Sequence, residues 1–209
     1  MKNAPPLVQR NRAVTEQKLI GAVGSILMRD GHAGLGVNAV AREACVDKVL
    51  IYRYFGGLTQ LVERFGRTAD FWPSEDELVG GDLARLQALP PKARYAEFVR
   101  SYVRAIRSRP LLREVLVWDA VEKSELTAVL DDIRESTAVN VISALADGVT
   151  DRPDDFFAVL AVLGAATHYF TIIARNTPVF AGVDLQSEEG WNRLETAMMR
   201  IVELFLSDE

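Results

Sequence analysis

The stretch from Val37 to Phe55 constrains this chain more than any other, because it encodes two short helices separated by a tight break. In its first half, apolar residues recur at positions i, i+3, i+4 and i+7, which places them on one helix face. They are Val37, Val40, Ala41 and Ala44. The break that follows contains Asp47, whose carboxylate is suited to accept from the free N–H groups of the next helix. The sequence therefore predicts a helix pair joined by a short turn.

The second helix of the pair, expected over residues 48–54, has two chemically different faces. Ile51 and Phe55 are apolar on one side, while the other side carries cationic, aromatic and small apolar groups. Such a helix fits the major groove of DNA, where Lys or Arg can read guanine and a small apolar group can contact a thymine methyl. Tyrosine hydroxyls commonly donate to phosphate oxygens. An ordinary helical hairpin with a solvated face shows the same pattern. The candidate DNA-binding residues are Lys48, Val49, Tyr52, Arg53 and Tyr54.

The run AVAREACV-DKVLIYRYFGG, with its surroundings from about residue 15 to residue 65, resembles the N-terminal domain of the TetR family of transcriptional repressors. The most specific part is the run of residues 51–55, IYRYF, after Ala41 and Ala44. Five positions depart from the family pattern. Cys45 replaces the usual Gly of the turn, Gly36 a capping Thr or Ser, Leu58 a Lys, and Val49-Leu50 a Gly-Thr pair. The change at Leu58 removes one expected phosphate contact.

The resemblance implies an all-α repressor of two domains. Residues 1–72, with a basic N-terminal arm, form the expected helix-turn-helix DNA-binding domain, and residues 73–209 form a larger helical domain that binds an effector and dimerises. The implied partners are double-stranded DNA with a near-palindromic operator, a small-molecule effector and a second copy of the chain. No cofactor is implied.

Charge and composition agree with this reading. The net charge is −5, but residues 1–70 hold 10 Lys and Arg against 6 Asp and Glu, a net charge of +4, and the remainder carries −9. An acidic remainder is compatible with DNA binding if it is held away from the duplex. One cysteine fits a reducing cytoplasm. We find no signal peptide and expect no apolar run long enough to span a membrane, so we predict a cytoplasmic protein.

The rest of the chain reads as helices. We expect either a flexible basic arm or a disordered terminus over residues 1–14, and a first helix from Thr15, as N-cap, to Asp30. Further helices are expected over residues 58–69, 83–89, 92–108, 111–121, 124–146, 153–175 and 187–206. Four arginines on the helix over 92–108 are interpreted as a salt-bridged, solvated face. No strand is predicted.

The helix over residues 153–175 is apolar nearly all round, which one helix cannot bury against its own chain alone. The last helix carries apolar residues at three- and four-residue spacing, so we expect these two helices to pair with their copies in a four-helix bundle. The other reading is that both helices are simply core.

A mostly apolar effector is expected to bind in the C-terminal domain, because large aromatic and polar-tipped residues interrupt its apolar stripes. Each of these residues could equally be an ordinary core residue. The candidate ligand-binding residues are Phe98, Tyr102, Trp118, His168 and Thr171.

Enzymatic chemistry is not readable in the sequence. One cysteine and two distant histidines cannot supply the usual metal ligand set, and no nucleophile–base set, P-loop or dinucleotide fingerprint occurs. We therefore predict neither a catalytic nor a metal site and no enzyme. The alternative function is a helical ligand-binding or interaction module without DNA binding, a reading that Leu58 and the pair Val49-Leu50 favour.

Overall fold

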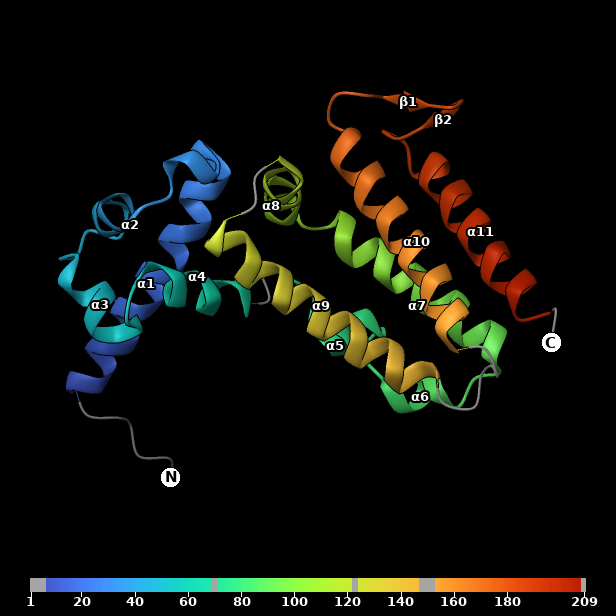
Figure 1. Cartoon of the computed structure of the whole chain (residues 1–209), viewed down its shortest axis with the longest axis horizontal. Coiled ribbons are helices and arrows are strands. Elements are labelled where there is room, and N and C mark those ends of the chain that lie inside the picture. The colour runs from blue at the N-terminus through green and yellow to red at the C-terminus, as the bar shows by residue number, and fades with distance from the viewer. Residues whose placement is uncertain (1–6, 69–70, 122–123, 147–152, 208–209) are drawn as a thin grey trace. The chain divides into compact units, whose positions relative to one another are not determined.

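The structure, a computed structural model, describes residues 7–68, 71–121, 124–146 and 153–207. These residues are almost entirely helical, which confirms the predicted all-α fold (Figure 1). In chain order the elements are α1 (Leu7–Asp30), η1 (His32–Gly34), α2 (Val37–Glu43), α3 (Val49–Phe55), α4 (Leu58–Gly66), α5 (Glu75–Leu78), α6 (Leu83–Gln87), α7 (Pro91–Arg107), α8 (Pro110–Val121), α9 (Glu125–Ala146), α10 (Pro153–Ile173), β1 (Val179–Phe180), β2 (Val183–Asp184) and α11 (Glu188–Phe205).

The chain divides into two compact units. Unit 1 takes in the described residues of Met1–Trp72 and Glu114–Ile133, and unit 2 those of Pro73–Arg113 and Arg134–Glu209. Helices α8 and α9 each contribute residues to both units. The return of residues 114–133 to the N-terminal unit had no signal in the sequence.

Unit 1 is built around α1, which packs against both α2 and α4, while α3 packs against α4. The buried face of α1 includes Leu19 and Val23, and its neighbours contribute Val40, Ile51 and Leu61, all fully buried. The predicted helix-turn-helix with a covering first helix is therefore present. Near the end of α4, a Cβ added to Gly66 would lie 2.7 Å from both Cδ2 of Leu130 and Cδ1 of Ile133. Because glycine stands there, α9 can approach α4 closely.

The expected start of the first helix was wrong. Helix α1 begins at Leu7, so residues 7–14 are helical rather than a flexible arm, while residues 1–6 lie outside the described residues. Thr15 is not an N-cap, because its hydroxyl donates to the carbonyl of Asn11 within the helix, at 2.8 Å. Arg12 and Glu16, which form an ion pair at i, i+4, support the added turns.

Unit 2 has α7 at its centre, packed against α5, α6, α10 and α11. The core is apolar and includes fully buried Tyr95, Leu86, Leu145 and Phe156. The C-terminal carbonyls of α9 are covered by side chains from the opposite side of the core. Arg94 donates to the carbonyl of Leu145 at 3.0 Å and to that of Gln87 at 2.6 Å. A cation there also suits the negative end of the α9 dipole.

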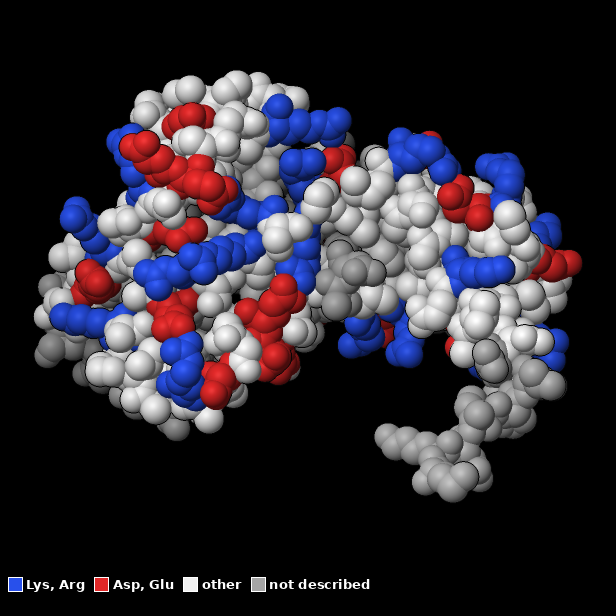
Figure 2. Space-filling view, turned by 180° about the vertical axis from the view of Figure 1, so that it is seen from behind, with Lys and Arg blue, Asp and Glu red and all other residues white. Residues whose placement is uncertain are grey.

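Arginines on α7 do not form one solvated face, contrary to the expectation. Arg94 reaches backbone carbonyls, and the guanidinium of Arg100 lies 3.7 Å from the sulfur of Met199. Arg107 does form a salt bridge, since it donates to both carboxylate oxygens of Glu188, and its guanidinium carbon lies 4.3 Å from the centre of the Trp191 ring. Figure 2 shows basic and acidic side chains interspersed over the face of unit 2 seen there.

Two further expectations were wrong. The sequence predicted no strand, yet β1 and β2 form an antiparallel hairpin between α10 and α11, too short to show alternation. The sequence also predicted no apolar run of membrane-spanning length. The stretch Asp154–Ile173 is, by length and composition alone, long and apolar enough to cross a membrane. Its mean hydropathy is 1.9, and 28% of it is buried in the chain.

Candidate nucleic-acid interface and interior polar cluster

Helix α3 presents the predicted DNA-binding residues at the surface of unit 1. Val49 is 61% and Tyr52 is 55% exposed, and Lys48 and Arg53 are also exposed. The opposite side of the helix is held by fully buried Ile51. The face that sequence patterning assigned to solvent therefore does face solvent, and its groups have the types that contact bases and phosphates.

Local backbone signals set where α3 begins and ends. The backbone N–H of Val49 donates to Oδ1 of Asp47 at 2.8 Å, the capping bond expected from the sequence. Cys45, in the preceding turn, has φ 54°, a left-handed conformation that favours glycine. At the other end, Gly56 adopts φ 94°, and its N–H donates to the carbonyl of Tyr52 at 2.9 Å. The two glycines 56 and 57 thus separate α3 sharply from α4.

Tyr54 is half-buried, and the guanidinium carbon of Arg12 lies 5.0 Å from the centre of its ring. This contact brings a basic residue of α1 beside α3. Sequence reasoning missed it, because the helix was expected to begin only at Thr15. The available signal was the lack of any Gly or Pro between residues 7 and 15.

A polar cluster lies inside unit 2 among apolar residues of α7 and α10. The hydroxyl of Tyr102 lies 2.8 Å from Nε2 of His168, and the rings of Phe98 and Tyr102 have centres 6.1 Å apart. Thr171 is buried, and its hydroxyl donates to the carbonyl of Thr167 at 2.8 Å. Of the five predicted ligand-binding residues, the structure places Phe98, Tyr102 and His168 together.

Burial controls the charge of this cluster. It raises the pKa of Tyr102, and together with the positive charge of Arg134 it lowers the pKa of His168 to about 4. At neutral pH the imidazole is therefore uncharged. In the tautomer with its proton on Nδ1, Nε2 accepts a hydrogen bond from the Tyr102 hydroxyl. The cluster offers hydrogen-bonding groups without a charge of their own.

Tyr95 belongs to the same stripe of α7 and was not among the predicted ligand-binding residues. Its side chain is fully buried, with its ring centre 6.3 Å from that of Phe98 and 4.6 Å from that of Phe156. Its hydroxyl has no hydrogen-bond partner among the described residues. A buried donor of this kind is suited to a bound acceptor. Its spacing from Phe98 and Tyr102, at i, i+3 and i+7, was the signal that could have identified it.

Trp118 belongs to unit 1, whereas the polar cluster around Tyr102 and His168 belongs to unit 2. Within unit 1 its indole stacks on the imidazole of His32, with ring centres 5.1 Å apart and planes inclined by 6°. The structure thus assigns Trp118 a contact with the segment that follows α1, a contact that sequence spacing could not reveal.

No protein-family model matches this sequence, and no curated protein matches it. Solved structures, however, share its fold. A protein from Mesorhizobium loti assigned to the TetR family of transcriptional regulators aligns with a TM-score of 0.63 at 15% identity, over 94% of this chain and 96% of that one. A TetR-like transcriptional regulator from Rhodococcus sp. RHA1 aligns with a TM-score of 0.58 at 16% identity, over 96% and 99%. The fatty acid degradation regulator FadR from Bacillus halodurans aligns with a TM-score of 0.58 at 12% identity, over 89% and 96%. These likenesses establish the fold.

Proposed function

We propose that this chain, which has the fold of TetR-family transcription regulators, is a DNA-binding regulator that acts as a repressor and is not an enzyme. The observation that carries the proposal is the exposed face of α3, where Lys48, Val49, Tyr52 and Arg53 stand on the second helix of a helix-turn-helix. A helix so presented enters the major groove, and a two-fold dimer reads two half-sites of a near-palindromic operator.

The test is binding to a DNA site selected from a random pool, with single variants of the full chain. Arg53→Ala should lose about 1–3 kcal/mol of binding free energy and relax specificity at one base pair if Arg53 reads that base. Lys48→Ala should weaken binding to all sequences and reduce its salt dependence if Lys48 contacts phosphate. Arg64→Ala is the matched control, since Arg64 is an exposed arginine of α4 in the same unit. If Arg53→Ala and Lys48→Ala combined bind as tightly as the control, α3 is not the reading helix.

The alternative function is a helical ligand-binding or interaction module that no longer binds DNA. The departures at Leu58 and Val49-Leu50 favour it. A gel shift with the DNA that flanks the chain's own gene separates the two functions, because the module leaves that DNA unshifted at any protein concentration.

We infer that unit 2 binds a small, mostly apolar effector whose polar group meets the cluster around Tyr102 and His168. Support comes from the mixture of apolar surroundings and a few convergent polar groups, which is typical of ligand sites. The Bacillus halodurans neighbour is named for fatty acid degradation, and an acyl compound would fit such surroundings. Release of DNA requires a ligand that prefers one conformation, and a tenfold shift needs about 1.4 kcal/mol of differential affinity.

The effector proposal is tested by substituting Tyr102→Phe, His168→Gln and Trp118→Phe singly and measuring effector-driven release from DNA. Loss of response at Tyr102 and His168 with DNA binding retained supports the site. Unchanged response in all three variants places the effector elsewhere.

We further propose that the chain is a homodimer through α10 and α11. The supporting observation is that the charge-free run of α10 between Asp155 and Arg175 remains largely uncovered in its own chain, with Val162 66% exposed. Light scattering at micromolar concentration tests this, with Val162→Glu expected to shift the mass toward that of a monomer. A monomer mass for the parent chain contradicts the proposal.

A further inference from the structure

The hairpin between α10 and α11 is a regular element with paired strands and a defined turn. Its strands pair Val179 with Asp184 and Phe180 with Val183. The two residues between them, Ala181 and Gly182, have φ of 48° and 79°. Positive φ at both central positions is the geometry of a type I′ turn, whose twist suits a two-residue hairpin.

Hydrogen bonds fix the base of the hairpin to both helices. The N–H of Leu185 donates to the carbonyl of Pro178 at 2.7 Å, and the indole of Trp191 donates to the carbonyl of Leu185 at 2.9 Å. The side chain of Gln186 donates to the carbonyl of Ala174 at the end of α10. Because Gly190 has no Cβ, the first turn of α11 can lie directly against the carbonyl of Asp184.

Both side chains of strand β1 keep exposed surface, although the ring centre of Phe180 also lies 5.6 Å from that of Phe170 on α10. Successive residues of a strand point to opposite sides, yet Val179 is 56% exposed and Phe180 is 38% exposed. An isolated two-stranded hairpin is only marginally stable in water. Both apolar side chains of β1 are therefore available to a partner.

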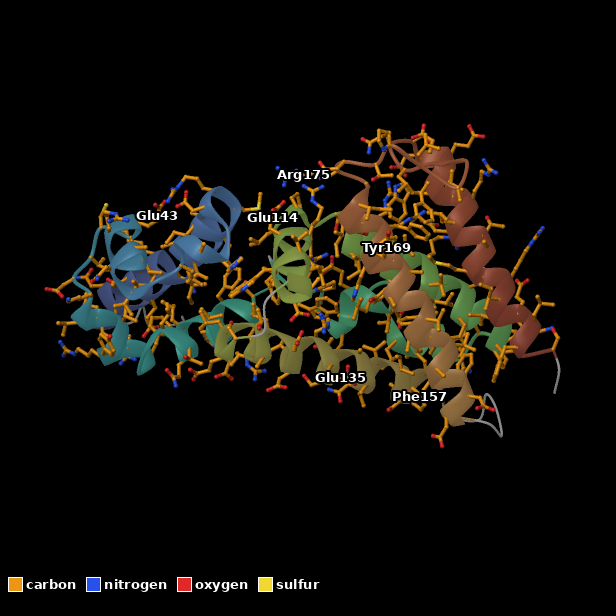
Figure 3. All side chains as sticks on the ribbon, turned by 45° about the horizontal axis from the view of Figure 1, so that its top comes forward. Glu43, Glu114, Glu135, Phe157, Tyr169 and Arg175 are labelled. Atoms are coloured by element: carbon orange, nitrogen blue, oxygen red, sulfur yellow. The ribbon has the colours of Figure 1, made fainter. Side chains whose placement is uncertain are left out.

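The exposed surface of β1 continues onto α10. The ring centre of Phe180 lies 6.0 Å from that of Tyr169, a residue of α10 that is 51% exposed (Figure 3). Tyr169 stands two helical turns after Val162, on the same face of α10. We name Val162, Tyr169, Val179 and Phe180 the arm patch. It joins the hairpin to the helix face proposed above as the dimer interface.

A complementary surface lies on the outer face of α11. This exposed face of one helix carries a shallow, open groove of about 550 Å³, lined by seven residues of α11. It combines short or apolar side chains (Thr196, Ala197 and Ile201) with longer polar ones. Two of the polar side chains, Arg193 and Arg200, make no ion pair with any described residue. The lining residues are Glu189, Asn192, Arg193, Thr196, Ala197, Arg200 and Ile201.

We propose that the hairpin of one copy docks in the α11 groove of a second copy, as an arm that reinforces the dimer. The inference rests on the proposed homodimer. The hairpin presents two apolar side chains and, paired with Val179, the exposed carboxylate of Asp184. The groove presents apolar surface and two guanidinium groups beside the one carboxylate of Glu189, so the two surfaces match in polarity and in net charge. In a two-fold dimer each copy supplies one arm and one groove.

The test measures the dimer dissociation constant of the full chain by analytical ultracentrifugation. Phe180→Ser and Val179→Ser should each raise it about tenfold or more, which corresponds to 1.4 kcal/mol. The matched control is Leu83→Ser on α6 of the same unit, because Leu83 is 37% exposed, close to the value for Phe180. Circular dichroism and thermal melts establish that each variant folds.

A double-mutant cycle tests the charge pairing. Asp184→Asn keeps the oxygen that accepts from the N–H of Gln186 but removes the charge. Arg193→Gln combined with Arg200→Gln removes the charges of the groove. If the charges meet across the dimer, the triple variant should be no weaker than the weaker of the two parent variants. Independent, additive effects overturn the charge pairing.

A photo-crosslinking amino acid at position 180 gives a positive readout. We expect a covalent dimer whose crosslinked peptide contains residues 189–201, and no such product from position 83.

If Val162→Glu dissociates the dimer while the hairpin variants do not, the arm proposal fails and the dimer stands. If the parent is monomeric, both fail. If the hairpin variants reduce binding to phosphatidylcholine vesicles and leave the dimer unchanged, the arm patch faces lipid and the proposal is overturned.

Discussion

The hydroxyl of Tyr102 and Nε2 of His168 lie 2.8 Å apart and join α7 to α10 inside unit 2. The histidine is held neutral there, because burial and the charge of Arg134 lower its pKa to about 4 from its ordinary 6.5. Protonation would place a positive charge near that of Arg134 in an interior that solvates charge poorly.

His168 should therefore make stability depend on pH. Between pH 4 and 6.5 the unfolded chain binds more protons at this residue than the folded chain does, so stability falls as the pH is lowered through that window. The free energy of unfolding that is lost through His168 should reach about 2 kcal/mol at pH 5. His168→Gln, which keeps a hydrogen-bonding group beside Tyr102, should remove that component. Urea unfolding of both proteins from pH 5 to 8 measures it, and parallel pH curves would contradict the assignment.

Gly66→Ala should destabilise unit 1. The added Cβ would lie 2.7 Å from methyl carbons of Leu130 and Ile133, and overpacking of this kind costs about 1–3 kcal/mol. Gly21→Ala is the control, because its Cβ would meet nothing within 4 Å and α1 should gain about 0.5–1 kcal/mol from the better helix former. Denaturant unfolding compares the two. Equal stability of both variants would show that α9 does not press on α4 in solution.

Cys45→Gly should stabilise the helix-turn-helix. The residue adopts φ 54°, which is strained for any side chain and free for glycine, so we expect a gain of up to about 1 kcal/mol after the greater entropy of unfolded glycine is counted. Cys45→Ala retains the Cβ and should bring no such gain. Thermal unfolding of the two variants checks the prediction, and an equal rise in both would point to the thiol rather than the backbone.

Arg94→Met should destabilise unit 2 by about 2–3 kcal/mol, because three backbone carbonyls would lose a charged donor. Lys92→Met is the control on the same helix, since Lys92 makes an exposed contact with Ser207 and its loss should cost less than about 0.5 kcal/mol. Amide hydrogen exchange of α9 locates the effect. Unchanged protection at its C-terminal end would mean that the arginine does not cap it.

Local signals accounted for most of the helices. Asp47 was expected to accept from the next helix, and its Oδ1 accepts from the N–H of Val49. The last helix was expected from residue 187, and the Ser187 hydroxyl accepts from the N–H of Gly190 in its first turn. The exposed face of α3 followed from helical spacing. Features that depend on contacts distant in the sequence were not predictable, such as the stacking of Trp118 on His32.

Short elements and missing breakers account for the other errors. Strands of two residues are too brief to show alternation, so the hairpin at Val179 was missed. The start of α1 at Leu7 was missed because Thr15 resembled a cap, although no residue between them interrupts a helix. The spacing of Tyr95 from Phe98 and Tyr102 was readable in the sequence, but the lack of a hydrogen-bond partner for its hydroxyl among the described residues was not, because it depends on contacts distant in the sequence.

Unit 1 is built from two separate stretches of the chain, so a gene that encodes it cannot be divided after residue 72 without loss of part of that unit. A truncation after residue 72 would leave out residues 114–133, including the Leu130 and Ile133 side chains that pack at Gly66. Unit 1 is thus not a segment that recombination could transfer by a single junction. A change in the surface chemistry of α3 would arise more readily by substitution there than by shuffling of gene segments.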